Sequence, residues 1–195
     1  IQANPPPTPI YVQINQTITI TLQDQQGMKL PGQTIQIREK RNGTVAFEAS
    51  LTTSETGQLT YTVASPSHEE ITIELTCAGT QQYEPCNYTL TFQPQLQPVN
   101  IHLVALPTLL KKPGNHTITI QATDPFNNPI PSLTINLNSP IWNSSTQTSE
   151  NGTATIPLPT STSTPFGPVN ITLWTRATGT YAPATISLSL TILEP

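Results

Sequence analysis

The chain has 195 residues, and its seven Lys or Arg and eleven Asp or Glu make up only 9% of it, against roughly 25% in ordinary soluble domains. The basic residues are scattered among the acidic ones, which excludes a basic nucleic-acid-binding patch, and no apolar run approaches the ~20 residues of a membrane span. Solubility rests on 76 Ser, Thr, Asn and Gln residues, whose hydration does not depend on pH, and this composition suits a surface exposed outside the cell.

The first fourteen residues, IQANPPPTPIYVQI, join a proline-rich stretch to a short alternating segment. The chain begins at Ile1 without a basic and apolar leader, so we expect a mature exported chain whose signal peptide has been removed. Residues 10–14 alternate with period two, which predicts a short strand. Its apolar face would carry Ile10, Val12 and Ile14.

A long internal repeat follows. Residues 15–37 read NQTITITLQDQQGMKLPGQTIQI, and residues 115–137 read NHTITIQATDPFNNPIPSLTINL, an offset of 100. Further on, TSETGQLTY (53–61) matches TSENGTATI (148–156) at an offset of 95. The offset changes between elements, where loops absorb insertions at little cost. The chain is therefore a duplicated domain.

Both copies alternate apolar and polar residues with period two, for example at 18–22, 71–75, 89–92 and 186–192. This pattern, rich in β-branched residues, predicts strands with one buried face. The 21 prolines and the lack of helical periodicity argue against long helices. Roughly seven short strands per copy predict an all-β chain of two tandem immunoglobulin-like β-sandwich domains.

The Gln/Pro stretch at residues 95–98 separates the copies and has the composition of a short, stiff linker. We therefore expect a first Ig-like domain at 15–94 and a second one at 99–195. Residues 1–14 are expected to form a separate N-terminal segment.

The turn region of each copy carries a family resemblance. The run from Asp24 through Pro31 into TIQI and TSETGQLTY, repeated from Asp124 through Pro131 into SENGTATI, resembles bacterial and archaeal Ig-like surface domains of the invasin/adhesin type. The resemblance implies the fold, but such domains serve equally as stalks, adhesins and filament subunits. The residues themselves indicate that Asp24 and Asp124 cap the turn after a strand.

Asn-x-Ser/Thr triplets are more frequent than the content of these residues predicts by chance. We expect covalent N-glycans on their asparagines and no other cofactor. The alternative is that Asn, Gly and Thr simply suit turns and strand edges. The triplets begin at Asn15, Asn42, Asn87, Asn115, Asn143, Asn151 and Asn170.

The two cysteines, Cys77 and Cys86, fall on adjacent expected strands of the first copy, where the second copy has Thr175 and Ala184. A hairpin brings such positions close together, and two cysteines in an exported protein usually pair. We therefore predict a disulfide between them. A metal site is not expected, because this pair lacks further ligands.

No catalytic pattern stands out. His68, His102 and His116 lie in different expected elements and share no ligand spacing. Glu69 and Glu70 are adjacent, so they point to opposite faces of a strand and do not form an acid–base pair. Nucleophile, zinc-protease and phosphate-binding motifs do not occur. We expect neither enzymatic activity nor a bound metal.

The copies differ at their start. The second copy opens with VNIHLVALPTLL (99–110), whereas the first has IQANPPPT at the corresponding place. We expect the first domain either to start short or to lack a strand that another chain supplies. An incomplete sandwich exposes an apolar groove and unpaired strand edges, which favour strand addition.

Tandem Ig-like domains, dense sequons, scarce charges and a free N-terminal strand together resemble the subunits of archaeal extracellular filaments called threads. That resemblance implies a glycosylated homopolymer in which residues 1–14 of one copy complete a neighbour by donor-strand complementation. Ile10, Val12 and Ile14 would then insert into the acceptor groove. Repetition of such a head-to-tail contact builds a filament.

A second hypothesis is kept beside the first. In it, residues 10–14 pair within their own domain, and the chain is a cell-surface adhesin or a surface-layer stalk. Such a module would bind a glycan or a protein through its loops. Both hypotheses place the protein outside the cell, and neither involves nucleic acid or a membrane span.

Overall fold

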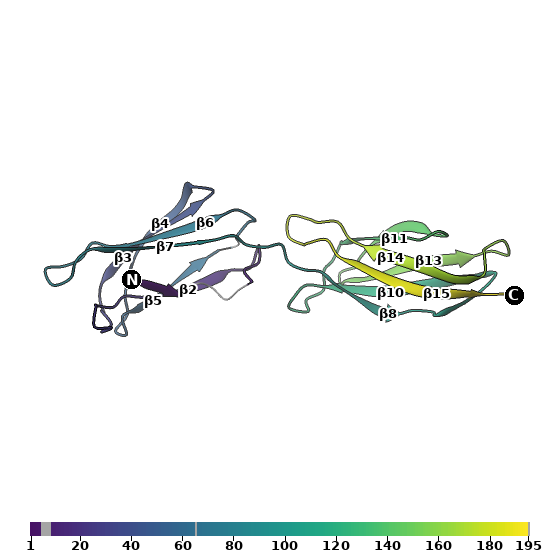
Figure 1. The fold of residues 1–195 in the computed structure, drawn as a ribbon, viewed down its shortest axis with the longest axis horizontal. Helices are drawn as coiled ribbons and strands as arrows, with labels where there is room; N and C mark the ends of the chain where they lie inside the picture. The colour runs from purple at the N-terminus through teal and green to yellow at the C-terminus, as the bar shows by residue number, and fades with distance from the viewer. Residues whose placement is uncertain (5–8, 65, 195) are drawn as a thin grey trace. The chain divides into compact units, whose positions relative to one another are not determined.

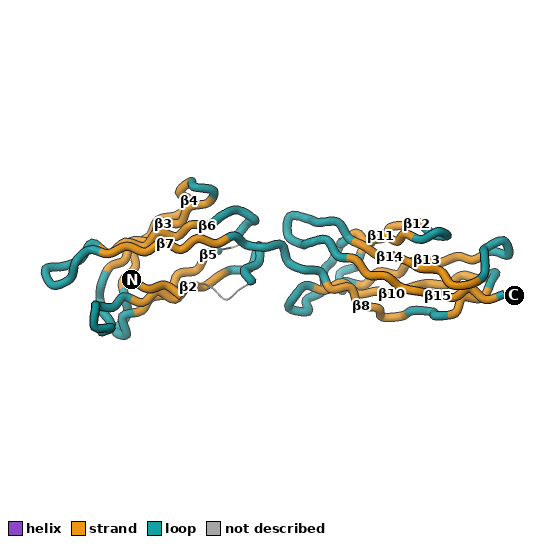
Figure 2. The backbone as a smooth tube through the Cα atoms, viewed as in Figure 1, coloured by secondary structure: helices purple, strands orange, loops and turns teal. Residues whose placement is uncertain are grey.

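The structure, a computed structural model, describes residues 1–4, 9–64 and 66–194. Within these ranges all of the regular secondary structure consists of β-strands. The chain divides into two compact units, Ile1–Leu96 and Gln97–Pro195, each a β-sandwich of two sheets (Figures 1 and 2). The predicted all-β tandem sandwich fold is therefore confirmed.

Unit 1 combines a three-stranded with a four-stranded antiparallel sheet. The chain changes sheet after β2, after β4 and after β5, and crossings of this kind between two sheets are typical of immunoglobulin-like sandwiches. The first sheet has the order β1 (Gln2–Asn4), β2 (Gln16–Thr21), β5 (Gln58–Val63). The second has the order β4 (Thr44–Thr52), β3 (Thr34–Arg41), β6 (Ile71–Cys77), β7 (Cys86–Phe92).

Unit 2 repeats this order and adds one short strand, β9, which pairs in parallel with β15. Its first sheet has the order β13 (Thr153–Thr160), β10 (Gly114–Thr123), β8 (Asn100–Ala105). Its second sheet has the order β12 (Asn143–Gln147), β11 (Thr134–Asn138), β14 (Gly167–Trp174), β15 (Thr185–Leu193), β9 (Leu109–Lys111).

The core of each unit consists of the apolar residues that alternate along the strands. Ile18 and Ile20 of β2 are buried, and so are Ile118 and Ile120 of β10, at the repeat offset of 100. Burying one such side chain contributes roughly 1.5–3 kcal/mol to folding. The alternation therefore fixes both the strand faces and the register.

Unit 1 has an opening strand of its own, contrary to the expectation that it starts short or lacks one. Strand β1 pairs with β2 and sets Ala3 opposite Ile20. In unit 2, β8 sets Leu103 opposite Ile120 in the same way. The sequence hides this strand because β1 has only three residues and one buried side chain, the small Ala3.

Residues 10–14 do not form the predicted strand. Tyr11 makes one isolated parallel bridge to Gln95, and a turn follows in which Gln13 has a φ of 60°. Ile10 and Val12 are nevertheless buried, with 6% and 1% exposure. Their backbone is held because Gln95 N–H donates to Ile10 C=O at 2.7 Å and Val12 N–H to Gln95 C=O at 2.9 Å. The chain must turn here to enter β2, which ends the pairing.

The predicted disulfide is not formed, since Cys77 and Cys86 are both free. They lie directly opposite each other on β6 and β7, so their side chains share the face that packs on the core. The backbone ladder runs from Ile71–Phe92 to this pair. Strand pairing and core packing therefore hold the hairpin without the covalent bond.

The turn motif of each copy closes one end of its sandwich. Asp24 accepts hydrogen bonds from the backbone N–H groups two and four residues on, at 2.9 and 2.8 Å. Asp124 does the same, at 2.8 Å for both bonds. The expected turn-capping role of these aspartates is confirmed.

A buried threonine, which directly follows β4 in unit 1 and β12 in unit 2, binds the backbone just after this turn. The Thr148 hydroxyl donates to Ile130 C=O at 2.6 Å and accepts from Leu133 N–H at 2.9 Å. Thr53 makes the equivalent pair of bonds in unit 1. Each hydroxyl therefore donates one hydrogen bond and accepts another in a buried site, where an unpaired polar group would be costly.

A glycine completes what we call the loop lock: Asp24, Thr53 and Gly57 in unit 1, and Asp124, Thr148 and Gly152 in unit 2. Both glycines have a backbone in the left-handed region, with a φ of 67° at Gly57 and 73° at Gly152. A Cβ at Gly152 would lie 2.6 Å from the Ala122 carbonyl oxygen, and one at Gly57 would lie 2.7 Å from the Lys29 Cβ. Only glycine fits there.

Gly57→Ala is expected to destabilise unit 1 by about 2–6 kcal/mol, because the strain of a positive φ adds to the steric clash. Gly43→Ala is the matched control, since Gly43 has a φ of 78° and open space around it. The control should cost only about 1–3 kcal/mol. Urea unfolding of the two variants measures the difference, and equal costs would contradict the steric part of the lock.

Candidate functional site

The three histidines lie at separate places in the structure. His68 Nδ1 lies 2.7 Å from Pro94 C=O, His116 Nε2 lies 2.7 Å from Lys111 C=O, and His102 is elsewhere, on β8. Among the residues that the structure describes, no three His, Cys, Asp or Glu side chains group as metal ligands. The same residues include no helix with the length and hydropathy to cross a membrane.

All seven sequon asparagines are exposed. Asn42 and Asn151 lie in the turns before β4 and β13, where a glycan can project away from the sheets. Asn87 and Asn170 lie on β7 and β14, at positions whose side chains point away from the core. N-glycosylation requires an asparagine at the protein surface. The structure thus imposes no burial that would keep any of these sites from modification.

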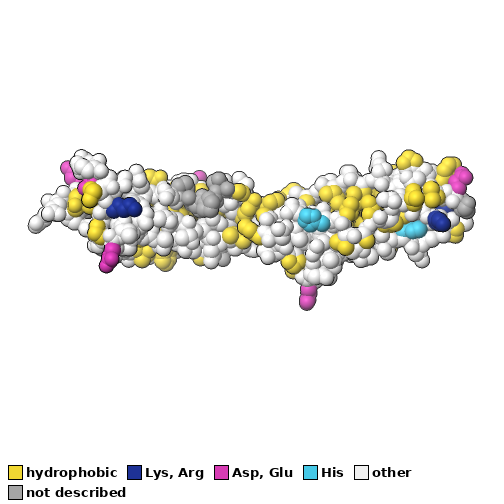
Figure 3. All heavy atoms as spheres, turned by 90° about the horizontal axis from the view of Figure 1, so that it is seen from below, with side chains coloured by type: hydrophobic (Ala, Val, Ile, Leu, Met, Phe, Trp, Pro, Cys, Tyr) yellow, Lys and Arg dark blue, Asp and Glu magenta, His cyan; other side chains and the backbone are white. Residues whose placement is uncertain are grey.

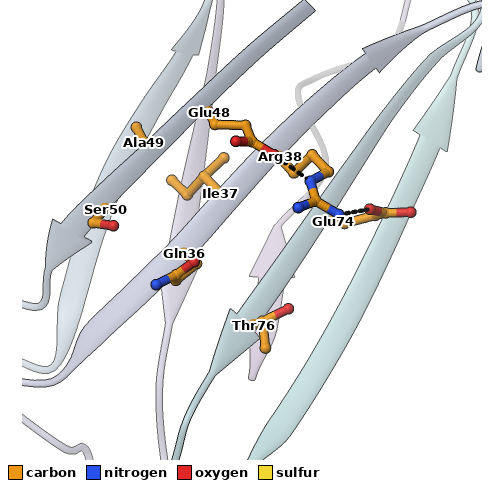
Figure 4. Close-up of a pocket in the computed structure, with 8 residues that line it drawn as sticks. All are labelled: Gln36, Ile37, Arg38, Glu48, Ala49, Ser50, Glu74 and Thr76. Carbon is orange, nitrogen blue, oxygen red and sulfur yellow. Dashed lines mark hydrogen bonds and ion pairs between the residues drawn. The ribbon is translucent and has the colours of Figure 1, made fainter. Parts of the chain in front are cut away.

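Unit 1 concentrates charge on the outer face of its four-stranded sheet, which sequence reasoning missed. Arg38 Nε lies 2.5 Å from Glu48 Oε1, and its Nη1 lies 4.0 Å from Glu74 Oε2. Lys40 Nζ lies 2.5 Å from Glu74 Oε1. Figure 4 shows Arg38 between the two glutamates, over a shallow groove of about 480 Å³ on β3, β4 and β6.

The positions of unit 2 that correspond to Arg38, Glu48 and Glu74 carry no charge. Pairing register places Arg38 opposite Glu48 and Glu74, and it places Asn138 opposite Asn143 and Thr172. Exposed ion pairs contribute only about 0–1 kcal/mol each to stability. The cluster therefore distinguishes the surface of unit 1 more than it stabilises the fold. Its side chains offer both signs of charge for recognition.

Beneath this face, a charged group is buried in the core of unit 1. Glu39, with 3% exposure, accepts hydrogen bonds from the Tyr61 hydroxyl at 2.6 Å and from Arg41 Nε at 2.9 Å. The Phe47 ring stacks on Tyr61 with the ring centroids 6.1 Å apart. Burial, followed by the hydrogen bond to Glu39 and its charge, raises the pKa of Tyr61 above its usual range.

Unit 2 exposes apolar side chains where unit 1 does not. Leu103 and Val104 of the edge strand β8 are 41% and 58% exposed. The corresponding positions of unit 1 hold Ala3 and Asn4. Figure 3 shows hydrophobic side chains gathered on one face of unit 2, seen from the side on which β8 lies in Figure 1. An apolar edge strand is a site for strand addition.

No family model matches the chain, and none of the curated proteins matches it. Among solved structures, the crystal structure of invasin, a bacterial integrin-binding protein, aligns with 100% of this chain at 18% identity and a TM-score of 0.48. This chain spans 39% of that structure. The D0–D1 domain of intimin aligns over 91% of this chain and 90% of its own length, at 16% identity and a TM-score of 0.35.

The ICAM-5 D1–D4 ectodomain fragment aligns over 99% of this chain and 54% of its own length, at 13% identity and a TM-score of 0.40. Likeness at this level carries no argument about ligand, partner or assembly. Any functional conclusion must therefore come from the residues of this chain.

The unfolding free energy is expected to fall as the pH rises above about 10, the ordinary pKa of tyrosine. Below that pH Tyr61 is protonated in both states. Above it the folded state still holds the proton that the unfolded chain releases, so stability is lost. Tyr61→Phe should remove part of this loss. At neutral pH it should lower the unfolding free energy by about 1–3 kcal/mol, because buried Glu39 then loses one of its two hydrogen-bond donors.

Denaturant titrations at pH 7 to 11 measure this dependence. Tyr88→Phe is the matched control, a half-buried tyrosine in the same unit. The control should keep the full alkaline loss. An unchanged slope in Tyr61→Phe would show that Tyr61 does not carry the effect.

Proposed function

We propose that the chain is a non-enzymatic module of an extracellular surface structure and acts as a spacer or stalk that presents binding surfaces. The observation that carries this proposal is the closure of unit 1 by its own N-terminal residues. Strand β1 pairs with β2, and Ile10 and Val12 are buried in the same unit. A module complete in itself needs no donated strand in order to fold.

The comparison of the two units supports this reading. The single bridge between Tyr11 and Gln95 corresponds to the pair Lys111–Leu193 of the β9–β15 ladder. Ile10 corresponds to Leu110, which is fully buried. Residues 2–4 and 10–11 of unit 1 thus take the places of residues 102–104 and 110–111 in unit 2, which favours two equivalent modules in series.

The neutral, sequon-rich surface supports a place outside the cell. Charged groups are few, and the polar surface consists mainly of hydroxyls and amides whose hydration does not change with pH. N-glycans on the exposed asparagines would cover the faces of both units. The charged face of unit 1 and the apolar edge of unit 2 are then the surfaces available to a glycan or protein ligand.

A second candidate is a filament subunit in which residues 1–14 complete a neighbouring copy. The favourable observation is that β1 has only three residues and lies at the edge of its sheet. Exchange of that strand between copies would form the same pairs in another molecule, which is the low-cost route of domain swapping. The pairing within one chain is then the closed form of the subunit.

Deletion of residues 1–14 separates the two candidates. A spacer is monomeric as the full chain, and the deletion should destabilise unit 1 by several kcal/mol through loss of buried Ile10 and Val12. A donor-strand filament instead polymerises as the full chain, and the deletion leaves monomers that accept the 1–14 peptide. Analytical ultracentrifugation and negative-stain microscopy measure the assembly state of both proteins. Polymers of the full chain that are absent after the deletion would contradict the spacer proposal.

N-glycosylation is tested independently of assembly. Intact-mass measurement of the protein purified from its own organism should give a mass above that of the polypeptide, reduced by enzymatic or chemical deglycosylation. Peptide mapping should place glycans on the turn asparagines, Asn42 and Asn151. A native mass equal to the polypeptide mass would contradict the modification.

A further inference from the structure

The loop between β6 and β7 and the loop between β14 and β15 are the same turn. Thr80 N–H donates to Tyr83 C=O at 2.8 Å, and Thr178 N–H donates to Tyr181 C=O at 2.9 Å. In both loops the threonine hydroxyl also accepts from the backbone N–H groups two and three residues on. The two loops therefore present the same backbone groups in the same arrangement.

In unit 2 this loop holds an extended segment. Gln97 N–H donates to Thr180 C=O, and Ala182 N–H donates to Gln97 C=O, both at 2.8 Å. Gln97 is 4% exposed, and Val99, two residues on, is buried in the core of the unit. The residues that enter unit 2 are thus fixed by one parallel bridge and one buried apolar side chain.

In unit 1 the corresponding groups are Gln82 C=O and Glu84 N–H. Both residues are exposed, and within residues 1–4, 9–64 and 66–194 neither group has a hydrogen-bond partner. Beside them lies a cavity of about 480 Å³ whose apolar lining includes Ile1, Leu22 and Leu30. The loop that carries Gln97 in unit 2 is therefore open in unit 1, next to space for a side chain.

We propose that this loop and cavity of unit 1 bind an extended, uncharged peptide segment with the chemistry of residues 97–99, Gln-Pro-Val. Its backbone pairs with Gln82 and Glu84 in a parallel bridge, and its apolar side chain enters the cavity. Asp24 and Glu84 line the cavity, and no basic residue does. An acidic segment, such as one carrying Glu194, is disfavoured there by repulsion between like charges.

The inference rests on the proposed function, since it assigns the peptide chemistry that such a spacer module binds at this loop. The test extends the full chain before Ile1 by Pro-Gln-Leu-Gln-Pro-Val-Asn, the sequence of residues 94–100. Ile1 corresponds to Ile101, so the extension reaches the loop in the register that unit 2 uses.

Amide hydrogen exchange is the readout. The extension should slow exchange at Glu84 N–H about tenfold. The Glu84 N–H gains a backbone hydrogen bond, and the valine of the extension holds the segment in the cavity. Ala182 N–H, which is bonded to Gln97 in the unaltered chain, serves as the internal reference. The control extensions carry proline for the second glutamine, which removes the donor to Gln82, or aspartate for valine.

Both control extensions should leave Glu84 exchange as it is in the unaltered chain. Equal exchange with all three extensions would overturn the proposal. Concentration-dependent protection of Glu84 in the unaltered chain would also overturn it, because the occupant would then be a second copy. The three extensions and the unaltered chain are compared at one protein concentration, whereas deletion of residues 1–14 tests the spacer proposal, so failure of one is distinguishable from failure of the other.

Discussion

The loop lock is the constraint on which both sandwiches depend. It fastens the turn after β2 or β10 to the start of β5 or β13 through a carboxylate, a buried hydroxyl and a glycine that allows the backbones to touch. Each hydroxyl and carboxylate that it buries is satisfied, so the junction costs no unpaired polar group. With this end closed, the alternating strands can meet only in one register.

One scaffold therefore carries two different surfaces. The inward residues of the units are mainly aliphatic, whereas the outward residues diverge, with ion pairs over β3 of unit 1 and apolar side chains along β8 of unit 2. Unit 1 also has a buried Glu39, held by Tyr61 and Arg41, that unit 2 replaces with Ser139. Duplication preserved the fold and left the faces free to change, so function belongs to the faces.

Much of the fold could be predicted from the sequence because period-two alternation and the offset of 100 are local signals. Asp24 and Asp124 were predictable caps for the same reason. The opening strand was not, because Gln2–Asn4 is short and buries only Ala3. Residues 10–14 alternate like a strand, but their turn at Gln13 depends on a bond from its N–H to Pro66 C=O, far along the chain.

The surface features escaped prediction for a related reason. Arg38, Glu48 and Glu74 meet only because β3 lies between β4 and β6, and sequence alone does not supply that pairing. The cysteines show the reverse case. The expected hairpin correctly placed the two residues opposite each other on β6 and β7. The predicted disulfide was wrong, since Cys77 and Cys86 are free.

Pairing of β1 with β2 of the same chain is what makes unit 1 a self-contained module. An isotope-filtered nuclear Overhauser measurement on a mixture of labelled and unlabelled copies detects this pairing through the contact between Ala3 and Ile20. We expect this contact to arise only within one chain. A contact between a labelled and an unlabelled copy would show instead that the strand is donated by a neighbour.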